Sequence, residues 1–157
     1  MAKSNKRFLI KGLKKNADLK SATSVMLDEK LKNVFILVDK FFEDDSEENL
    51  HQLRIALRRF RYLLETLYIC VDDELFTSVL KKTKNILDEL GEGRDQDVLA
   101  LRLKEIAKEK KAACSKEILN LLKDKQIETR QKIKIELIKY ICDNNVNKFF
   151  RKNKLGG

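Results

Sequence analysis

The 157-residue sequence contains no proline and only five glycines. Proline interrupts helices and glycine weakens them, so their scarcity predicts long, continuous α-helices. Tryptophan is also absent, and the chain shows neither an alternating strand pattern nor an internal repeat. We therefore expect an all-α fold: an up-and-down bundle of about four long antiparallel helices with short flanking helices.

Cysteine is scarce too, with Cys70, Cys114 and Cys142 far apart in the chain. An odd number of widely spaced cysteines beside apolar helix positions is typical of reduced thiols in a core. It argues against a disulfide framework and against a CxxC metal site. No apolar run is long enough for a signal peptide or a membrane span. We predict a cytoplasmic protein with no membrane partner, metal or cofactor.

Charged residues make up 38% of the chain, hydrophobic residues 43%, and the formal net charge is +9. The hydrophobic share suits one globular domain with a real core, so the high charge does not indicate disorder. A positive net charge attracts anionic partners over long distances, although lysine-rich surfaces also serve solubility. Charge therefore favours an anionic class of partner without naming one.

The hydrophobic pattern divides the chain into a basic N-terminal segment, residues 1–16, and a single helical bundle, residues 17–157. Apolar residues at helical spacing predict long helices over about residues 17–43, 48–71, 74–90 and 116–143, with a shorter helical pattern through residues 99–106.

The stretch LGEGRDQDV, residues 90–98, predicts an interruption between two helices. Gly91 would end one helix in the conformation with positive φ that glycine favours. Asp95 or Asp97 would cap the next helix, whose first-turn N–H groups can bind an anion. Arg94 either contacts such an anion or pairs with an acid in an ordinary helix connection.

The stretch LHQLRIALRRFRYLLETL, residues 50–67, holds the only histidine of the chain and four of its nine arginines. On a helix, one apolar stripe gathers Leu53, Leu57, Phe60, Leu64 and Leu67. Beside it, basic residues recur every three or four positions and form a row: His51, Arg54, Arg58 and Arg61. Arg59 projects away from that row.

No acid occurs between residues 51 and 64, so the repulsion within the row is not relieved by its own helix. Arginine offers a planar fork of donors that matches phosphate or carboxylate oxygens two at a time. The pattern favours an anion-binding row over a solvated charged face. Three lysines of the following helix could extend the row: Lys81, Lys82 and Lys84.

Two motifs resemble those of the CHAD family, an α-helical domain named for a characteristic histidine. HQLRIALRRFR, residues 51–61, resembles the family signature H-x-x-R-x-x-x-R-R-x-R. LGEGRDQDV resembles the L-G-x-x-R-D-x-D-V turn of the same family, which lies one helix later, as it does here.

The resemblance implies a helical bundle whose basic surface binds inorganic polyphosphate without catalysis. It places on the polyphosphate His51, Arg54, Arg58, Arg59, Arg61 and Arg94, with Lys81, Lys82 and Lys84 as auxiliary cations. It gives Asp95 and Asp97 a supporting role, in orienting the arginines or capping a helix. Family members typically carry two bundles in tandem across a basic channel, whereas this chain has room for one. A homodimer would replace the missing half, because a two-fold axis could set two rows opposite each other.

Other functions fit parts of the pattern. An arginine row also suits a nucleic-acid backbone, but apart from Phe60 and Tyr62 it has no interleaved aromatic residues on which bases could stack. A phosphate-ester or polyphosphate hydrolase, or an accessory module of one, usually needs a metal held by clustered carboxylates. The acids here lie in capping runs such as EDDSEE, residues 43–48. A helical protein-interaction module is a third alternative.

Overall fold

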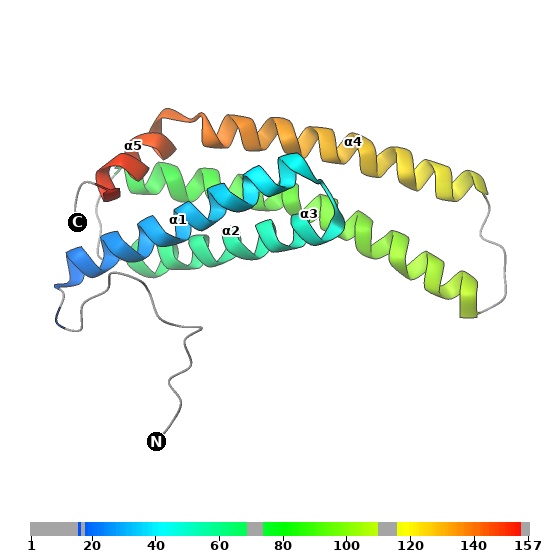
Figure 1. Cartoon of the computed structure of the whole chain (residues 1–157), viewed down its shortest axis with the longest axis horizontal. Coiled ribbons are helices and arrows are strands. Elements are labelled where there is room, and N and C mark those ends of the chain that lie inside the picture. The colour runs from blue at the N-terminus through cyan, green and yellow to red at the C-terminus, as the bar shows by residue number, and fades with distance from the viewer. Residues whose placement is uncertain (1–15, 17, 69–73, 110–115, 155–157) are drawn as a thin grey trace, which may run out of the picture.

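The computed structural model describes residues 16, 18–68, 74–109 and 116–154, and these residues fold into five helices (Figure 1). The helices are α1 (Leu19–Glu43), α2 (Glu47–Leu67), α3 (Glu74–Glu109), α4 (Lys116–Ile141) and α5 (Asn144–Lys154). The described residues contain no strand, so the predicted all-α bundle is confirmed. The predicted N-terminal segment lies outside them apart from Asn16.

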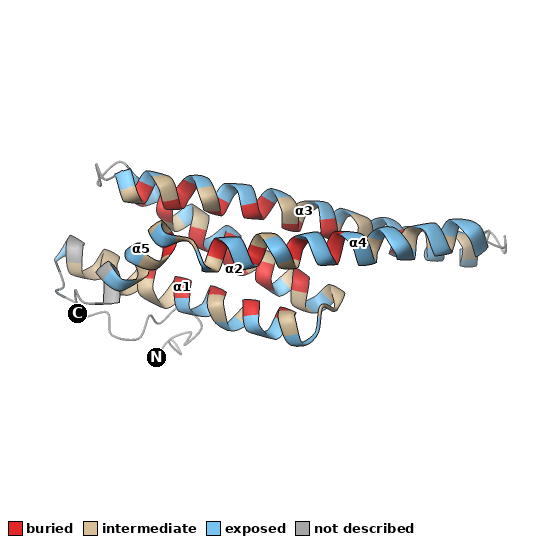
Figure 2. Ribbon diagram, turned by 90° about the horizontal axis from the view of Figure 1, so that it is seen from above, coloured by how far each residue is buried: buried red, intermediate tan, exposed pale blue. Residues whose placement is uncertain are grey.

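The helices form two antiparallel hairpins that pack side by side. α1 pairs with α2, α3 pairs with α4, α2 packs on α3, and α5 folds back across α1 and α3. The second hairpin is longer, and its far half extends past the α1–α2 hairpin (Figure 1). We call this extension the arm and define it as residues 98–109 and 116–128. Apart from Ala100, every residue of the arm is exposed or half-buried (Figure 2).

One continuous core holds the bundle together. The predicted apolar stripe of α2 lies in it, since Leu53, Leu57 and Phe60 are completely buried. α5 adds Phe149, whose ring lies edge-on to Phe60, at 6.5 Å between ring centroids. Edge-to-face packing is a favoured arrangement of aromatic rings. The short last helix therefore closes the core at the end opposite the arm (Figure 1).

The predicted helix break at residues 90–98 is wrong. α3 continues through Gly91 to Glu109, Gly91 has no positive φ, and neither Asp95 nor Asp97 caps a helix. A glycine inside a helix costs only about 1 kcal/mol relative to alanine. The buried side of α3 continues across the stretch, with Leu90 and Ala100 on either side of it, and this packing outweighs the cost.

Cys142 is an exposed free thiol, so its predicted place in the core is wrong. It directly follows α4, where the chain turns toward α5. Cys70 and Cys114 lie outside the described residues. Among the described helices, none is both long and apolar enough to cross a membrane.

Asp143 ties α5 to α3. Its Oδ1 accepts hydrogen bonds from the backbone N–H groups of Asn145 at 2.9 Å and Val146 at 3.1 Å, and its Oδ2 lies 2.7 Å from Nζ of Lys82. Desolvation acts to raise the pKa of Asp143. The hydrogen bonds from Lys82 and the two N–H groups outweigh it and hold that pKa below its ordinary value.

Replacing Asp143 with alanine removes a helix cap, so we expect a loss of about 1 kcal/mol in unfolding free energy at neutral pH, measured by urea denaturation. The lowered pKa means that the unfolded chain binds the proton first as pH falls. The stabilisation is therefore complete above the ordinary pKa of 3.8 and disappears as pH drops through the lower folded value. Asp124→Ala, on the exposed arm, is the control. A difference between wild type and Asp143→Ala that persisted at the acid end would contradict this role.

Candidate anion-binding surface

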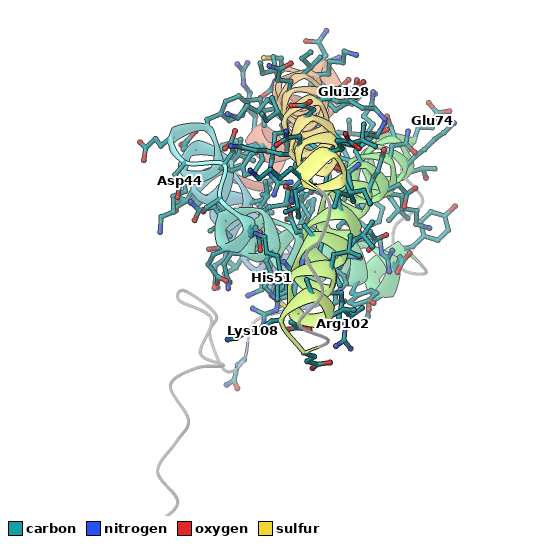
Figure 3. All side chains as sticks on the ribbon, turned by 90° about the vertical axis from the view of Figure 1, so that its right-hand side faces the viewer. Asp44, His51, Glu74, Arg102, Lys108 and Glu128 are labelled. Atoms are coloured by element: carbon teal, nitrogen blue, oxygen red, sulfur yellow. The ribbon has the colours of Figure 1, made fainter. Side chains whose placement is uncertain are left out.

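Four basic side chains of α2 form a row beside its buried stripe. We call this set the cationic row, and it consists of His51, Arg54, Arg58 and Arg61. Arg58 is exposed and the other three are half-buried. The row lies on the flank of α2 that faces α3, because Glu65, one turn beyond Arg61, contacts Lys84 of α3 at 3.1 Å. Figure 3, which looks along the bundle from the arm, shows His51 on this flank.

Most of the cationic row has no counter-charge within the described part of the chain. There, His51, Arg54 and Arg58 form no ion pair, and Nδ1 of His51 and Nε of Arg54 are buried without a hydrogen-bond partner. Arg61 differs: its Nε lies 3.6 Å from Oε2 of Glu65, and its guanidinium lies 4.7 Å from the ring centroid of Tyr62. Like charges one turn apart repel each other, so the unpaired part of the row carries positive charge that no described residue neutralises.

Arg94 of α3 joins the His51 end of the row. The preceding residue, Gly93, approaches α2 so closely that an added Cβ would lie 3.2 Å from Cδ2 of Leu50. Arg94 follows the buried Leu87 and Leu90 by seven and four residues, so it shares their side of α3. That side faces α2 at the height of its first turns. The two motifs, distant in sequence, therefore meet in space.

The surface of α3 beside the row is open. Gly91 follows Lys84 by seven residues and so lies on the same side of α3, next to the row. An added Cβ at Gly91 would meet no heavy atom within 4 Å. This glycine therefore leaves room beside the row.

The predicted auxiliary lysines separate into two groups. Lys81 and Lys84 line a hollow of about 400 Å³ between α2 and α3, beside Glu65 at the Arg61 end of the row. Lys82 lies on another side of α3 and pairs with Asp143, so the structure does not bring it to the row. A step of one residue turns a helix by about 100°, which explains why neighbouring lysines point to different surfaces. Arg59 is exposed, and on α2 it projects from the flank opposite the row.

The sequence matches the family description "CHAD domain" over residues 9–149. This chain belongs to the CHAD family. No curated protein and no solved structure matches it. The two motifs that resembled the family thus lie within one CHAD domain, where the structure places His51 and Arg94 at the same end of the row.

Asp97 of the CHAD motif LGEGRDQDV supports the fold from within α3 instead of capping it. Its carboxylate is completely buried and lies 2.7 and 2.8 Å from Nη2 of Arg130 in α4. Nε of Arg130 in turn donates to the backbone carbonyl of Asp45, between α1 and α2, at 3.0 Å. One buried ion pair therefore joins α3, α4 and the start of α2. Asp95 is exposed and makes no hydrogen bond or ion pair to the described residues.

Arg130 belongs to neither motif of the CHAD domain, and its partner lies 33 residues away in the sequence. A signal was nevertheless present. Arg130 precedes the buried Ile133 and Leu137 by three and seven residues, so it occupies a core position of the apolar stripe of α4. A charged residue at such a position is rarely buried unless it is paired.

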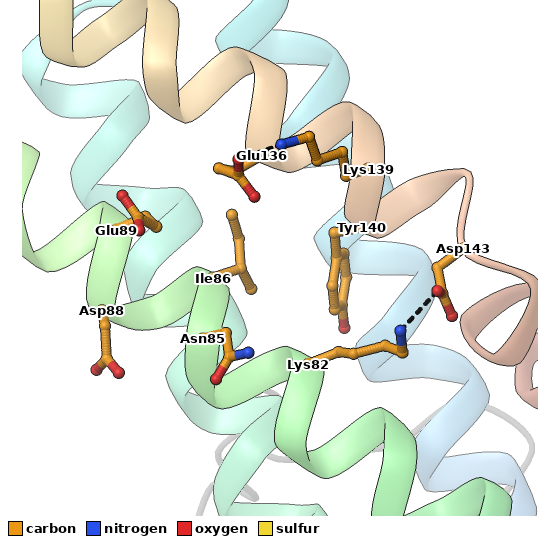
Figure 4. Close-up of a pocket in the computed structure, with 9 residues that line it drawn as sticks. All are labelled: Lys82, Asn85, Ile86, Asp88, Glu89, Glu136, Lys139, Tyr140 and Asp143. Atoms are coloured by element: carbon orange, nitrogen blue, oxygen red, sulfur yellow. Dashed lines mark hydrogen bonds and ion pairs between the residues drawn. The ribbon is translucent and has the colours of Figure 1, made fainter.

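A second hollow of this CHAD domain, of about 470 Å³, lies between α3 and α4 (Figure 4). Its basic residues already have partners: Lys82 pairs with Asp143, and Lys139 pairs with Glu136 at 2.6 Å. The acids Asp88 and Glu89 also line it. This hollow therefore lacks the uncompensated positive charge of the row. In the described part of the chain, no group of three His, Cys, Asp or Glu side chains is placed to hold a metal.

Replacing Asp97 with alanine would leave the Arg130 guanidinium buried without its counter-charge. We expect a loss of about 3 kcal/mol or more in unfolding free energy, measured by urea denaturation. Asp95→Ala, two residues away on the exposed side of the same helix, should change stability little. Similar losses in the two variants would contradict a special role for the buried pair.

Proposed function

We propose that this CHAD domain binds inorganic polyphosphate along the cationic row, without catalysis. The observation that carries the proposal is a set of basic side chains that have no counter-charge among the described residues: His51, Arg54 and Arg58, with Arg94 beside them. Membership of the CHAD family supports a phosphate chain as the anion.

The spacing of the row suits a chain of phosphates. Its neighbouring residues lie about 5 to 6 Å apart on the helix surface, and the ten steps from His51 to Arg61 span roughly 15 Å along the axis. Each arginine can contact two phosphate oxygens at once. A rigid row of forks therefore fits a flexible ligand that carries anionic oxygens at every unit.

Binding of single-stranded nucleic acid is less well supported, because such sites usually provide aromatic side chains on which bases stack. Of the two aromatic residues noted in the motif, Phe60 is completely buried in the core. The ring of Tyr62 is covered on one side by Arg61. The row thus provides phosphate contacts without an evident base platform.

We further propose that the protein acts in the cytoplasm and forms a homodimer, in which a second copy supplies the second basic surface. Absence of turnover is part of the proposal, and an assay for phosphate release with added magnesium would test it. Release that depended on the metal would favour a hydrolase instead.

Replacing both Arg54 and Arg58 with alanine should weaken polyphosphate binding about 100-fold at low salt, because each lost charge-assisted contact contributes about 1.5 kcal/mol or more. Isothermal titration calorimetry with medium-chain polyphosphate at two salt concentrations measures this. The salt dependence should also become shallower, by about one unit of slope per cation removed. The control, Lys40→Ala with Arg151→Ala, removes two exposed charges from α1 and α5. Equal binding by the two double variants would refute the row as the site.

Glu65 neutralises the Arg61 end of the row, because its two carboxylate oxygens contact Arg61 and Lys84. Glu65→Gln should release both cations and strengthen binding of long polyphosphate several-fold, since a carboxylate no longer competes with phosphate for them. Glu128→Gln on the arm makes the same change in net charge and is the control. The gain should be specific to Glu65→Gln in a competition titration. An equal gain in both variants would indicate a general charge effect.

A further inference from the structure

The arm exposes large apolar side chains. Leu121 is 71% exposed, and Leu99, Ile118 and Ile106 are 49%, 49% and 46% exposed. No described helix covers them, because the α1–α2 hairpin ends before the arm begins (Figure 1). Single exposed apolar residues are ordinary on protein surfaces, but a contiguous group often marks an interaction site.

These side chains share one face of the helix pair. Near the bundle, Glu92 of α3 and Lys132 of α4 lie 3.4 Å apart and mark that face. Steps of seven and eleven residues return to nearly the same side of a helix. Leu99, Leu103 and Ile106 follow Glu92 by seven, eleven and fourteen residues, and Leu121 and Ile118 precede Lys132 by eleven and fourteen. We call these five residues the arm patch: Leu99, Leu103, Ile106, Ile118 and Leu121.

The arm has little packing of its own to stabilise it. Its two stretches, of 12 and 13 residues, are the ends of α3 and α4, and most helical stability in proteins comes from tertiary packing of an apolar face. Within the arm, only Ala100 is buried. A partner on the arm patch would supply the apolar burial that the other described residues do not supply.

Charge favours a second copy as that partner. The α3 part of the arm has three bases and two acids, and the α4 part has three of each. The arm is thus nearly neutral in a chain of net charge +9. A second arm brings an equally apolar surface with both signs of charge. Because each arm is nearly neutral, the electrostatic repulsion between two arms is small. A polyanion, by contrast, is attracted to the row and not to the arm.

We propose that two copies of this chain associate through their arm patches, each arm packing on the other in a self-complementary contact. Leu99 lies eight residues beyond Gly91, about 80° further round α3. The arm patch therefore adjoins the open side next to the cationic row. A partner docked there stands beside the row and can extend the basic surface, and this last consequence rests on the proposed polyphosphate function.

The association is tested without any polyanion, by sedimentation equilibrium over a range of protein concentrations. Wild type should dimerise, and Leu121→Glu should raise the dimer dissociation constant at least 10-fold while far-UV circular dichroism stays unchanged. Ile106→Glu, on the other arm helix, should do the same. Ile36→Glu is the matched control, because Ile36 is 55% exposed on α1, away from the arm, and it should dimerise like wild type.

Three results would overturn the proposal: a wild type that stays monomeric up to roughly 100 μM, well above a micromolar dissociation constant; dimers unaffected by both arm variants; or equal weakening by Ile36→Glu. Titration of the same proteins with polyphosphate keeps the two proposals distinguishable. A wild type that dimerises but binds no polyphosphate would refute the proposed function alone. A monomeric wild type that binds polyphosphate would refute the arm contact and the proposed homodimer, and would leave the polyphosphate site on the row standing.

Discussion

The burial of one stripe of α2 determines where the candidate residues of that helix lie. Leu53, Leu57 and Phe60 are completely buried between the neighbouring helices, so α2 cannot rotate about its axis without exposing them. Burial of each such side chain contributes roughly 1.5 to 3 kcal/mol. The rotation of α2 thereby fixes which flank carries the cationic row. Charge does not choose that flank; the hydrophobic core does.

The Asp97–Arg130 pair fixes a second feature of the site, the position of α3 along the axis of α2. It holds α3 and α4 together where Gly93 permits close approach, since a Cβ there would lie 2.6 Å from Cδ1 of Ile133. Arg130 also reaches the chain just before α2. Arg94, one residue from Gly93, is thereby kept at the height of His51. The sequence of the motif LGEGRDQDV predicts a turn, but in the structure the motif lies within α3 and forms the contact of this helix with α2 and α4.

The fold could be predicted because long helical periodicity without proline leaves few alternatives. The row could be predicted because its members share one helix, where spacing alone determines direction. Lys82 and Asp97 show the limit of prediction from helical spacing. Both lie on α3, where spacing determines their directions, but the partners that they meet there, Asp143 and Arg130, come from segments far away in the sequence. The break predicted at Gly91 was wrong because local propensity, about 1 kcal/mol for a glycine, is smaller than the packing around it.

The chain distributes its charge unevenly, and this separates two kinds of recognition. Along the row, Arg54 and Arg58 lie one turn apart without partners among the described residues, and their mutual repulsion costs stability until an anion neutralises it. A ligand that binds only the folded state raises the free energy of unfolding. The increase grows with the logarithm of the ligand concentration once the site is mostly filled. Along the arm, bases and acids nearly balance around apolar side chains, which suits contact with a like surface. Because the two surfaces adjoin on α3, an anion on the row would change the electrostatic surroundings of a second copy on the arm, and the proposed binding and the proposed association would be linked equilibria.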